Sequence, residues 1–439
     1  MKTIQSYVLI LLTMISLSSC ESYFGDININ PDDPITVTPN VLLPQIQVRL
    51  AYTVWGDGSR YVGIYTQHID GISRQFATIQ NYDLQPNNLD AMWDNLYSGV
   101  LMDNRQLQIA AEANGYTHYL GVSKAVEAYA LLFITDIFGD APYSESFQGT
   151  EIIQPKFDSQ ETLFTTIFAL IDESRGLLNQ EDASGVTPGA DDLLYGGDLA
   201  KWEAFLSVLE ARAKLHLSKR DATNYQDALD ALADGFTSAE GDARLTFGST
   251  ATASAPWYQY IEQRDDIEIG DSYVALMEGL NDPRKDAYGV LLDVPAHPIF
   301  IRERAVPLLS YTEQKFIEAE ALFETSGAAA AQDAYLAAIE ASFAEAGVEG
   351  YADYVAQESV VPANGITLEH IITQKYIALF ADPEVFSDWR RTGIPELDPN
   401  TGSTVPRRLP YAQKEILSNE NTPSPADVTV FTRIWWDVQ

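Results

Sequence analysis

The sequence predicts a mainly α-helical protein whose helices form adjacent pairs. Apolar residues recur three and four positions apart in most of the strongly patterned segments, which is the period of a helix with one buried face. These helical segments occur as adjacent pairs along the chain. Only short stretches have the sequence pattern of β-strands. The clearest helical segments are Leu120–Phe138, Gln160–Leu178, Ala200–Ser218, Asn224–Leu232, Tyr311–Phe323, Ala329–Phe343 and Leu368–Phe380.

The first twenty residues have the pattern of an export signal. Lys2 precedes an apolar run from Tyr7 to Leu17, which is too short to span a bilayer. The sequence Leu-Ser-Ser-Cys then ends at Cys20, the only cysteine of the chain, and resembles the lipobox of bacterial lipoproteins. We therefore expect residues 1–19 to be a signal peptide and Cys20 to be lipidated. The alternative is an ordinary cleaved signal with an unrelated cysteine.

A polar segment with several prolines between residues 31 and 39 follows the cysteine. Proline restricts the backbone to extended conformations, so residues 20–40 are expected to form the lipidated cysteine and a semi-rigid tether. No later segment is apolar enough to span a bilayer, and we expect membrane attachment through the lipid anchor alone. Residues 41–439 are expected to form a single domain.

The balance of charge is strongly acidic. The chain has 63 acidic and 27 basic residues, a formal net charge of −36. Nucleic-acid binding requires clustered lysine and arginine, so the composition argues against a nucleic-acid partner. Because 46% of the residues are hydrophobic and 11% are aromatic, the chain can bury a large core.

Boundary signals agree with the helical pattern. Asp158-Ser159 is an N-cap sequence, and Gly139 follows an apolar helix as a C-terminal stop. Ala334-Tyr335 and Ala338-Ile339 resemble the second helix of a tetratricopeptide repeat, and stacked pairs of this kind leave loops free for binding. A generic helical bundle is the alternative. The predicted pairs are 119–138 with 160–178, 200–218 with 225–232, and 311–323 with 331–343.

Three irregular stretches, at residues 54–92, 236–310 and 392–439, separate the helix pairs. They are rich in Gly, Pro, Asn, Asp and aromatic residues. Loops on a rigid scaffold are where binding residues concentrate. Within the second stretch, residues 245–247 and 300–302 have the character of short strands.

Aromatic residues in these stretches are the candidate ligand contacts. Flat rings stack on sugar rings or on peptide side chains, and neighbouring polar groups bond hydroxyls or amides. Trp257 and Tyr258 follow a Ser-Ala-Pro sequence, so we expect their rings on a loop rather than in a helix. The alternative is that such rings close the core beneath long loops. The predicted ligand-binding residues are Trp55, Tyr65, Arg74, Trp257 and Tyr258.

Catalytic and metal-binding motifs are missing from the sequence. It lacks a zincin motif, a nucleophile elbow, a phosphate-binding loop and a dinucleotide fingerprint, and its five histidines are scattered. Asp57-Gly58-Ser59 and Asp265-Asp266 could each contribute to a structural calcium site, although neither has EF-hand spacing. The sequence therefore indicates no catalytic residue and calls for no enzyme activity, although it does not exclude an enzyme. We expect no cofactor, with a structural calcium ion as the open alternative.

Six motifs, in order along the chain, resemble those of the SusD/RagB family of outer-membrane lipoproteins of Bacteroidetes. One departure is Ser207, where many members have Asn. The motifs are Trp93-x3-Tyr97-x6-Asn104, residues 135–143 (TDIFGDAPY), residues 201–205 (KWEAF) continuing to Arg212, residues 388–395 (DWRRTGIP), residues 408–411 (RLPY) followed by Glu415 and Asn419, and Trp435-Trp436-Asp437.

The resemblance implies a right-handed scaffold of four tetratricopeptide-like helix pairs, with an irregular, loop-rich second half that carries the ligand site. It also implies a surface lipoprotein of the outer membrane. Such a protein binds a nutrient, first of all an oligo- or polysaccharide, and delivers it to a SusC-like TonB-dependent transporter. Members catalyse nothing, and Asp140, Pro142, Arg390 and Arg391 are implied to be scaffold residues. A peptide-binding member, a helical-repeat envelope adaptor and a surface glycoside hydrolase are the alternatives.

Overall fold

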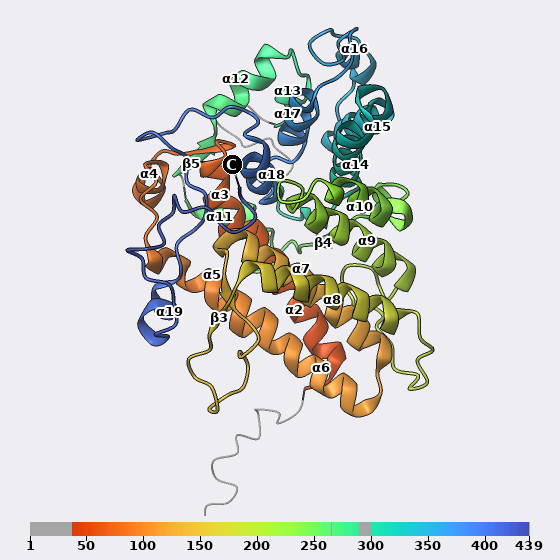
Figure 1. Cartoon of the computed structure of the whole chain (residues 1–439), viewed down its shortest axis with the longest axis vertical. Coiled ribbons are helices and arrows are strands. Elements are labelled where there is room, and N and C mark those ends of the chain that lie inside the picture. Colours follow the sequence, from red (N-terminus) through yellow and green to blue (C-terminus); the bar gives the residue numbers. More distant parts are fainter. Residues whose placement is uncertain (1–36, 265, 289–299, 439) are drawn as a thin grey trace, which may run out of the picture. The chain divides into compact units, whose positions relative to one another are not determined.

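Helix pairs form the body of the protein, as the sequence predicts (Figure 1). The computed structural model describes residues 37–264, 266–288 and 300–438. Residues from Pro39 onward form one compact unit. The expected signal peptide, Cys20 and Asp265 of the calcium hypothesis lie outside the described residues.

All seven predicted helices are present. They are α7 (Thr117–Phe138), α8 (Gln160–Leu178), α9 (Leu199–His216), α10 (Thr223–Ala231), α14 (Tyr311–Ser326), α15 (Ala328–Ala346) and α17 (Leu368–Ala378). Each predicted pair is packed together: α7 against α8, α9 against α10, and α14 against α15. The prediction of paired helices is therefore confirmed.

Local sequence sets the ends of these helices. At the start of α8, Ser159 Oγ accepts a hydrogen bond from the backbone N–H of Thr162 at 3.2 Å. α7 ends before Gly139, whose φ of 77° favours glycine. Asp140 then accepts a hydrogen bond from the backbone N–H of Gln160 at 2.8 Å, which fixes the connection to α8. Asp140 is thus a scaffold residue, as the resemblance implied.

The first part of the chain is more helical than predicted, and the stretch 54–92 is not irregular. Two elements, η1 (Val54–Gly58) and η3 (Asn95–Leu101), are π-helices, whose wider turns shift the apolar stripe out of its 3.6-residue period. Pro44 also lies inside the first helix. The elements of this part are α2 (Pro39–Thr53), α3 (Ser59–Tyr65), α4 (Arg74–Gln80), η2 (Pro86–Leu89), α5 (Asp90–Asp94) and α6 (Met102–Asn114).

Strands in the described residues form antiparallel pairs. These are β1 (Ile69–Gly71) with β5 (Ile267–Ile269), β2 (Ala141–Pro142) with β3 (Phe157–Asp158), and β4 (Ala243–Thr246) with β6 (Ala305–Leu309). The predicted strand at 245–247 overlaps β4, in which Leu245 lies opposite Val306. The predicted strand at 300–302 is wrong, because β4 pairs with residues a few positions later in the chain.

The remaining described helices are short and lie mainly in the second half of the chain. They are η4 (Leu232–Asp234), η5 (Ala239–Gly241), α11 (Pro256–Gln263), α12 (Asp271–Gly279), α13 (Arg284–Tyr288), α16 (Tyr351–Val355), α18 (Glu384–Thr392) and α19 (Gln413–Ser418). In the described ranges, no helix combines the length and the apolar character that crossing a bilayer requires.

Buried ion pairs join the helix pairs to α17 and α18. Arg391 Nη2 lies 2.6 Å from Glu320 Oε2, and Arg390 Nη1 donates a hydrogen bond to the backbone carbonyl of Asp136 at 2.7 Å. Both arginines therefore hold the scaffold, in agreement with the resemblance. We call the following set the buried charge cluster: Asp136, Arg212, His216, Glu313, Glu320, Lys375, Glu384, Asp388 and Arg391.

Candidate functional site

The two aromatic-rich stretches singled out in the sequence lie against each other around α11. β1 pairs with β5, and the indole Nε1 of Trp257 donates a hydrogen bond to Ser59 Oγ at 3.0 Å. The rings of Phe76 and Tyr260 meet edge to face, with centroids 5.4 Å apart. Residues almost two hundred positions apart in the sequence therefore belong to one region of the structure.

Three of the five predicted ligand residues belong to the core. Trp55 is 5% exposed, and Tyr65 and Trp257 are 0% exposed. Trp55 Nε1 donates a hydrogen bond to the carbonyl of Pro307 at 2.7 Å. Trp257 lies in the first turn of α11, where Pro256 begins the helix, so the expectation of a loop-borne ring is wrong. None of the three rings presents a free face to a ligand, and for them the core alternative holds.

The other two predicted residues, Arg74 and Tyr258, reach the surface. The side chain of Arg74 is 56% exposed, and its Nη1 lies 4.0 Å from Asp266 Oδ2. Arg302 covers the ring of Tyr258: its guanidinium carbon is 4.6 Å from the ring centroid, and it donates a hydrogen bond to the hydroxyl at 2.5 Å. One face of Tyr258 is therefore occupied. Ligand binding by Arg74 and Tyr258 stays a prediction.

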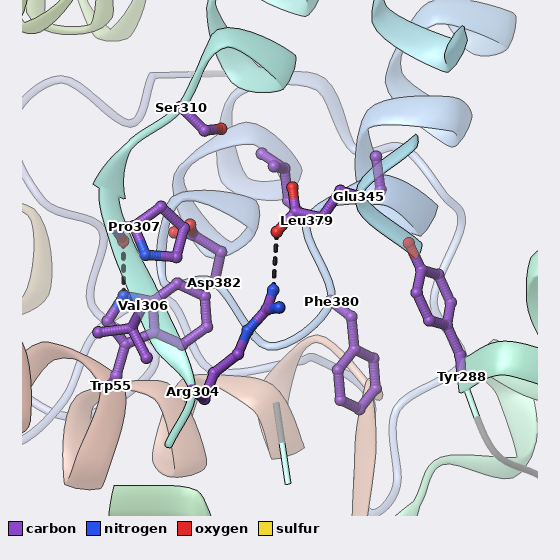
Figure 2. A pocket seen from close by; sticks show the side chains of 11 residues that line it. Trp55, Tyr288, Arg304, Val306, Pro307, Ser310, Glu345, Leu379, Phe380 and Asp382 are labelled. Atoms are coloured by element: carbon purple, nitrogen blue, oxygen red, sulfur yellow. Dashed lines mark hydrogen bonds and ion pairs between the residues drawn. The ribbon is translucent and has the colours of Figure 1, made fainter. Parts of the chain in front are cut away.

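A small cavity lies beside Trp55 and β6 (Figure 2). Its volume is about 40 Å³, which is room for two or three water molecules. On its wall, Arg304 Nη2 pairs with Glu345 Oε1 at 2.7 Å, and burial raises the pKa of the Asp382 carboxyl to about 7. A sugar ring does not fit here, so we assign this cavity to the core.

An open groove of about 500 Å³ runs along the outer face of α2. Its volume falls within the roughly 300–1,000 Å³ that is typical of ligand pockets. The α2 residues of the groove are spaced three and four apart, so they share one face of the helix. The groove is lined by Pro44, Gln45, Val48, Arg49 and Tyr52 of α2 and by Asn95 of η3. We call it the α2 groove.

Tyr52 connects the α2 groove with the region around α11. Its hydroxyl donates a long hydrogen bond to Gln259 Oε1 at 3.4 Å, and its ring meets the edge of Phe247 with centroids 6.4 Å apart. The side chain is half-buried. It is therefore held in place by its neighbours while part of its ring faces the groove.

A second open groove, of about 490 Å³, lies between α8, α9 and α10, but its chemistry is different. Its two basic residues each pair with a carboxylate of the lining, Arg175 with Glu210 at 2.8 Å and Lys214 with Asp227 at 3.4 Å. No aromatic side chain lines it among the described residues. It offers a ligand no ring to stack on, and its charges without an ion pair in the described part of the chain, Asp230 and Asp234, are carboxylates.

The α2 groove combines the side chains that recognise sugars. A tyrosine ring can stack on the apolar face of a sugar, and amides can both donate to and accept from hydroxyl groups. Gln45 and Asn95 supply the amides, and Arg49 adds a guanidinium. Sequence reasoning missed these residues because it did not predict α2. The spacing of Gln45, Arg49 and Tyr52 on one helical face was the available signal.

The described carboxylates of the calcium sites suggested by the sequence contact other side chains of the protein. Asp57 Oδ1 lies 2.7 Å from Arg60 Nη2, and Asp266 accepts a hydrogen bond from the Tyr260 hydroxyl. Across the part of the chain that the structure describes, no group of three or more His, Cys, Asp or Glu side chains is arranged to hold a metal. The structure therefore adds no support to calcium binding at Asp57.

Comparison with known proteins gives a consistent result. A family model described as starch-binding and associating with the outer membrane matches residues 31–298 and 293–412. Among curated proteins, none matches the chain significantly. Many solved structures do match over most of the chain.

Three of these structures illustrate the likeness. A SusD/RagB family protein from Bacteroides thetaiotaomicron is 23% identical, covers 92% of this chain and 99% of its own, and has a TM-score of 0.75. A SusD-like protein of Bacteroidetes is 21% identical, with 92% and 100% covered and a TM-score of 0.79. A chitin-binding SusD homologue from Flavobacterium johnsoniae is 21% identical, with 91% and 98% covered and a TM-score of 0.76. These likenesses show a shared fold.

Proposed function

The chain belongs to the SusD-like family of starch-binding proteins that associate with the outer membrane, and from this premise we propose that it binds a nutrient glycan in the α2 groove. The proposed protein is a lipoprotein, attached through Cys20 and facing the cell exterior. It delivers the glycan to a SusC-like TonB-dependent transporter. Its task is binding and transfer rather than catalysis.

One observation carries this proposal: a half-buried tyrosine ring, a guanidinium and two amides converge in one open groove. Tyr52 is the ring on which a sugar stacks, and its contacts with Gln259 and Phe247 hold it in position. Gln45 and Asn95 are suited to hydroxyl groups because an amide offers both donors and an acceptor. The chitin-binding activity named for one similar structure supports a polysaccharide rather than a peptide as the ligand class.

An open groove also suits delivery to a transporter. A ligand that lies on one helix face leaves much of its surface in water, so its affinity depends on few contacts and its dissociation is fast. A tyrosine ring has two rotatable side-chain angles and loses little entropy on binding. Weak stacking over several sugar units would hold the glycan while still allowing its release.

Calorimetry with a glycan and peptide panel tests the binding proposal. We expect the mature protein to bind at least one oligosaccharide, and Tyr52→Ala to weaken that binding by roughly three- to tenfold, since one stacked ring contributes about 0.5–1.5 kcal/mol beyond its buried area. Tyr116→Ala is the matched control, because Tyr116 is also half-buried but lies at the start of α7, outside the groove. Binding of peptides alone, or unchanged glycan affinity in Tyr52→Ala, would contradict the proposal.

Purification from membranes in mild detergent tests the transporter proposal. We expect the lipidated protein to co-purify with a large β-barrel transporter, and Cys20→Ala to abolish its membrane attachment. A lipidated protein that runs alone, with no transporter gene beside its own, would contradict the partnership and leave glycan binding to be judged by calorimetry.

A further inference from the structure

Arg49 is an arginine without a partner in a strongly acidic chain. The protein has 63 acidic and 27 basic residues, so a cation at the surface readily finds a carboxylate. In the described part of the chain, only Arg49 and Lys219 have side chains that form no ion pair, hydrogen bond or ring contact. Each other described lysine or arginine contacts a carboxylate, a carbonyl or an amide.

The two unpaired cations lie in different surroundings. Lys219 is exposed after the end of α9, where water solvates its ammonium group. Arg49 is half-buried and lines the α2 groove. Partial burial of the side chain removes some of its water, and a cation with less water around it is normally compensated by a counter-charge. None of the described residues that line the groove is a carboxylate, and Asp103, which accepts a hydrogen bond from the lining residue Gln45 at 2.7 Å, forms no ion pair with Arg49.

Gly99 of η3 fixes the position of the Arg49 side chain. A methyl group placed on Gly99 would lie 2.1 Å from Arg49 Cδ and 2.3 Å from Nη1. The guanidinium therefore rests directly on the backbone of the π-helix, at a place where only glycine leaves room. Asn95 of the same π-helix lines the groove, so η3 supplies both the support for Arg49 and one of the amides.

The arrangement places the cation next to the stacking ring. Arg49 and Tyr52 are three residues apart on α2, and side chains at this spacing are neighbours on a helix, with Cβ atoms about 5–6 Å apart. A sugar that stacks on Tyr52 would bring a substituent of its ring toward the guanidinium. Guanidinium groups bind carboxylates and sulfate-like oxyanions through paired hydrogen bonds.

We infer that the α2 groove selects anionic glycans, with Arg49 binding a carboxylate or sulfate group of the sugar that stacks on Tyr52. This inference rests on the proposed glycan-binding function and adds the chemical class of the ligand. The net charge of the protein does not prevent such binding, because at about 0.15 M salt the repulsion is screened beyond roughly 8 Å. The short-range pair with Arg49 survives this screening.

Calorimetry with chemically matched ligand pairs tests the inference. The probes are oligogalacturonate against its methyl ester, and a sulfated galactan oligosaccharide against its desulfated form, so that the members of each pair differ at the charged group alone. A glutamate-rich peptide is the third anionic probe. We expect one charged oligosaccharide to bind roughly tenfold or more tightly than its neutral counterpart, and the two pairs to distinguish carboxylate from sulfate.

Four variants of the full mature chain locate the effect. Arg49→Gln should remove the preference for the charged form over its neutral counterpart, while Arg49→Lys should retain part of the preference because the charge remains without the planar fork. Gly99→Ala should weaken charged binding by displacing the guanidinium. Lys219→Gln is the matched control and should change nothing. Thermal melting confirms that each variant is folded.

Defined outcomes would overturn the inference. If neutral and charged members of each pair bind equally, or if Arg49→Gln keeps the preference, the groove is not selective for anions although glycan binding itself stands. If the acidic peptide binds more tightly than every oligosaccharide in an Arg49-dependent manner, the ligand is a peptide. If no oligosaccharide binds, both the inference and the proposed function fail.

Discussion

Arginine has opposite roles in the buried charge cluster and in the α2 groove. In the cluster, Arg391 is fully buried and lies between two carboxylates, with its Nη2 2.6 Å from Glu320 Oε2 and 3.0 Å from Asp388 Oδ1. In the groove, Arg49 is half-buried and has no counter-charge. The same side chain therefore stabilises the fold where it is matched and is free for a ligand where it is not.

Aromatic residues show the same contrast. Trp257 is fully buried and its indole N–H is satisfied by Ser59, whereas Tyr52 is half-buried and lines an open groove. The sequence made Trp257 the more attractive ligand residue, and the structure favours Tyr52. Burial and pairing together, rather than residue type, separate structural from ligand-binding side chains in this protein.

The largest loss in the free energy of unfolding is expected when the buried charge cluster is disrupted. Arg391→Ala leaves Glu320 and Asp388 buried without their cation, and should lower the free energy of unfolding by about 5 kcal/mol, the upper end for a broken buried pair. Chemical denaturation measures it. Lys156→Ala, which removes an exposed cation 3.4 Å from the partly exposed Glu145, is the control and should change stability by less than about 1 kcal/mol. Equal losses of stability from the two substitutions would show that buried and exposed cations contribute alike, which contradicts the comparison.

Trp257→Ala should come next, with a loss of about 3 kcal/mol in the free energy of unfolding, because it opens a cavity in the core and leaves Ser59 without its donor. Glycan affinity should be unchanged in the protein that remains folded. Denaturation and calorimetry on the same preparation measure both quantities. A loss of glycan affinity without a loss of stability would show that Trp257 binds the ligand and is not a core residue.

The buried charge cluster should also make stability depend on pH. Burial alone would lower the pKa of His216, but Asp136 and Glu384 outweigh it and raise the pKa to about 9. Because the folded-state pKa lies above the unfolded value of about 6.5, this stabilisation is complete below about pH 6.5 and is lost as the pH rises through 9. We expect a decline of roughly 2–3 kcal/mol over that range.

Comparison with His216→Gln isolates this histidine from other titrating groups. Asp382, whose pKa burial raises to about 7, also lowers stability as the pH rises, and it is present in both proteins. Denaturation from pH 6 to 10 should therefore show a smaller decline in His216→Gln than in the wild type. Identical pH profiles would mean that His216 is not charged in the folded protein.

The smallest effect on stability is expected in the α2 groove. Tyr52→Ala and Arg49→Gln remove side chains that are partly open to solvent, so we expect changes below about 1 kcal/mol in the free energy of unfolding. Their effect should appear in binding instead. If either substitution destabilises the protein as strongly as Trp257→Ala, the groove residues are part of the scaffold and the comparison fails.

Periodicity predicted the helix pairs because their buried faces repeat every 3.6 residues over long segments, as in α8 and α14. It did not predict α2 or its groove, since Pro44 interrupts the pattern and the π-helices η1 and η3 shift its phase. The opposite environments of Trp257 and Tyr258 were also hidden. Neighbouring residues on a helix point about 100° apart, so one is buried while the next reaches the surface.

A crystal structure of the mature protein with its tightest-binding oligosaccharide tests the central claim most directly. The account predicts a sugar ring stacked on Tyr52 in the α2 groove, with its hydroxyl groups bonded to Gln45 or Asn95. A charged substituent should lie within hydrogen-bond distance of Arg49. A glycan bound instead beside Arg74 and Tyr258, with the α2 groove empty, would contradict the account.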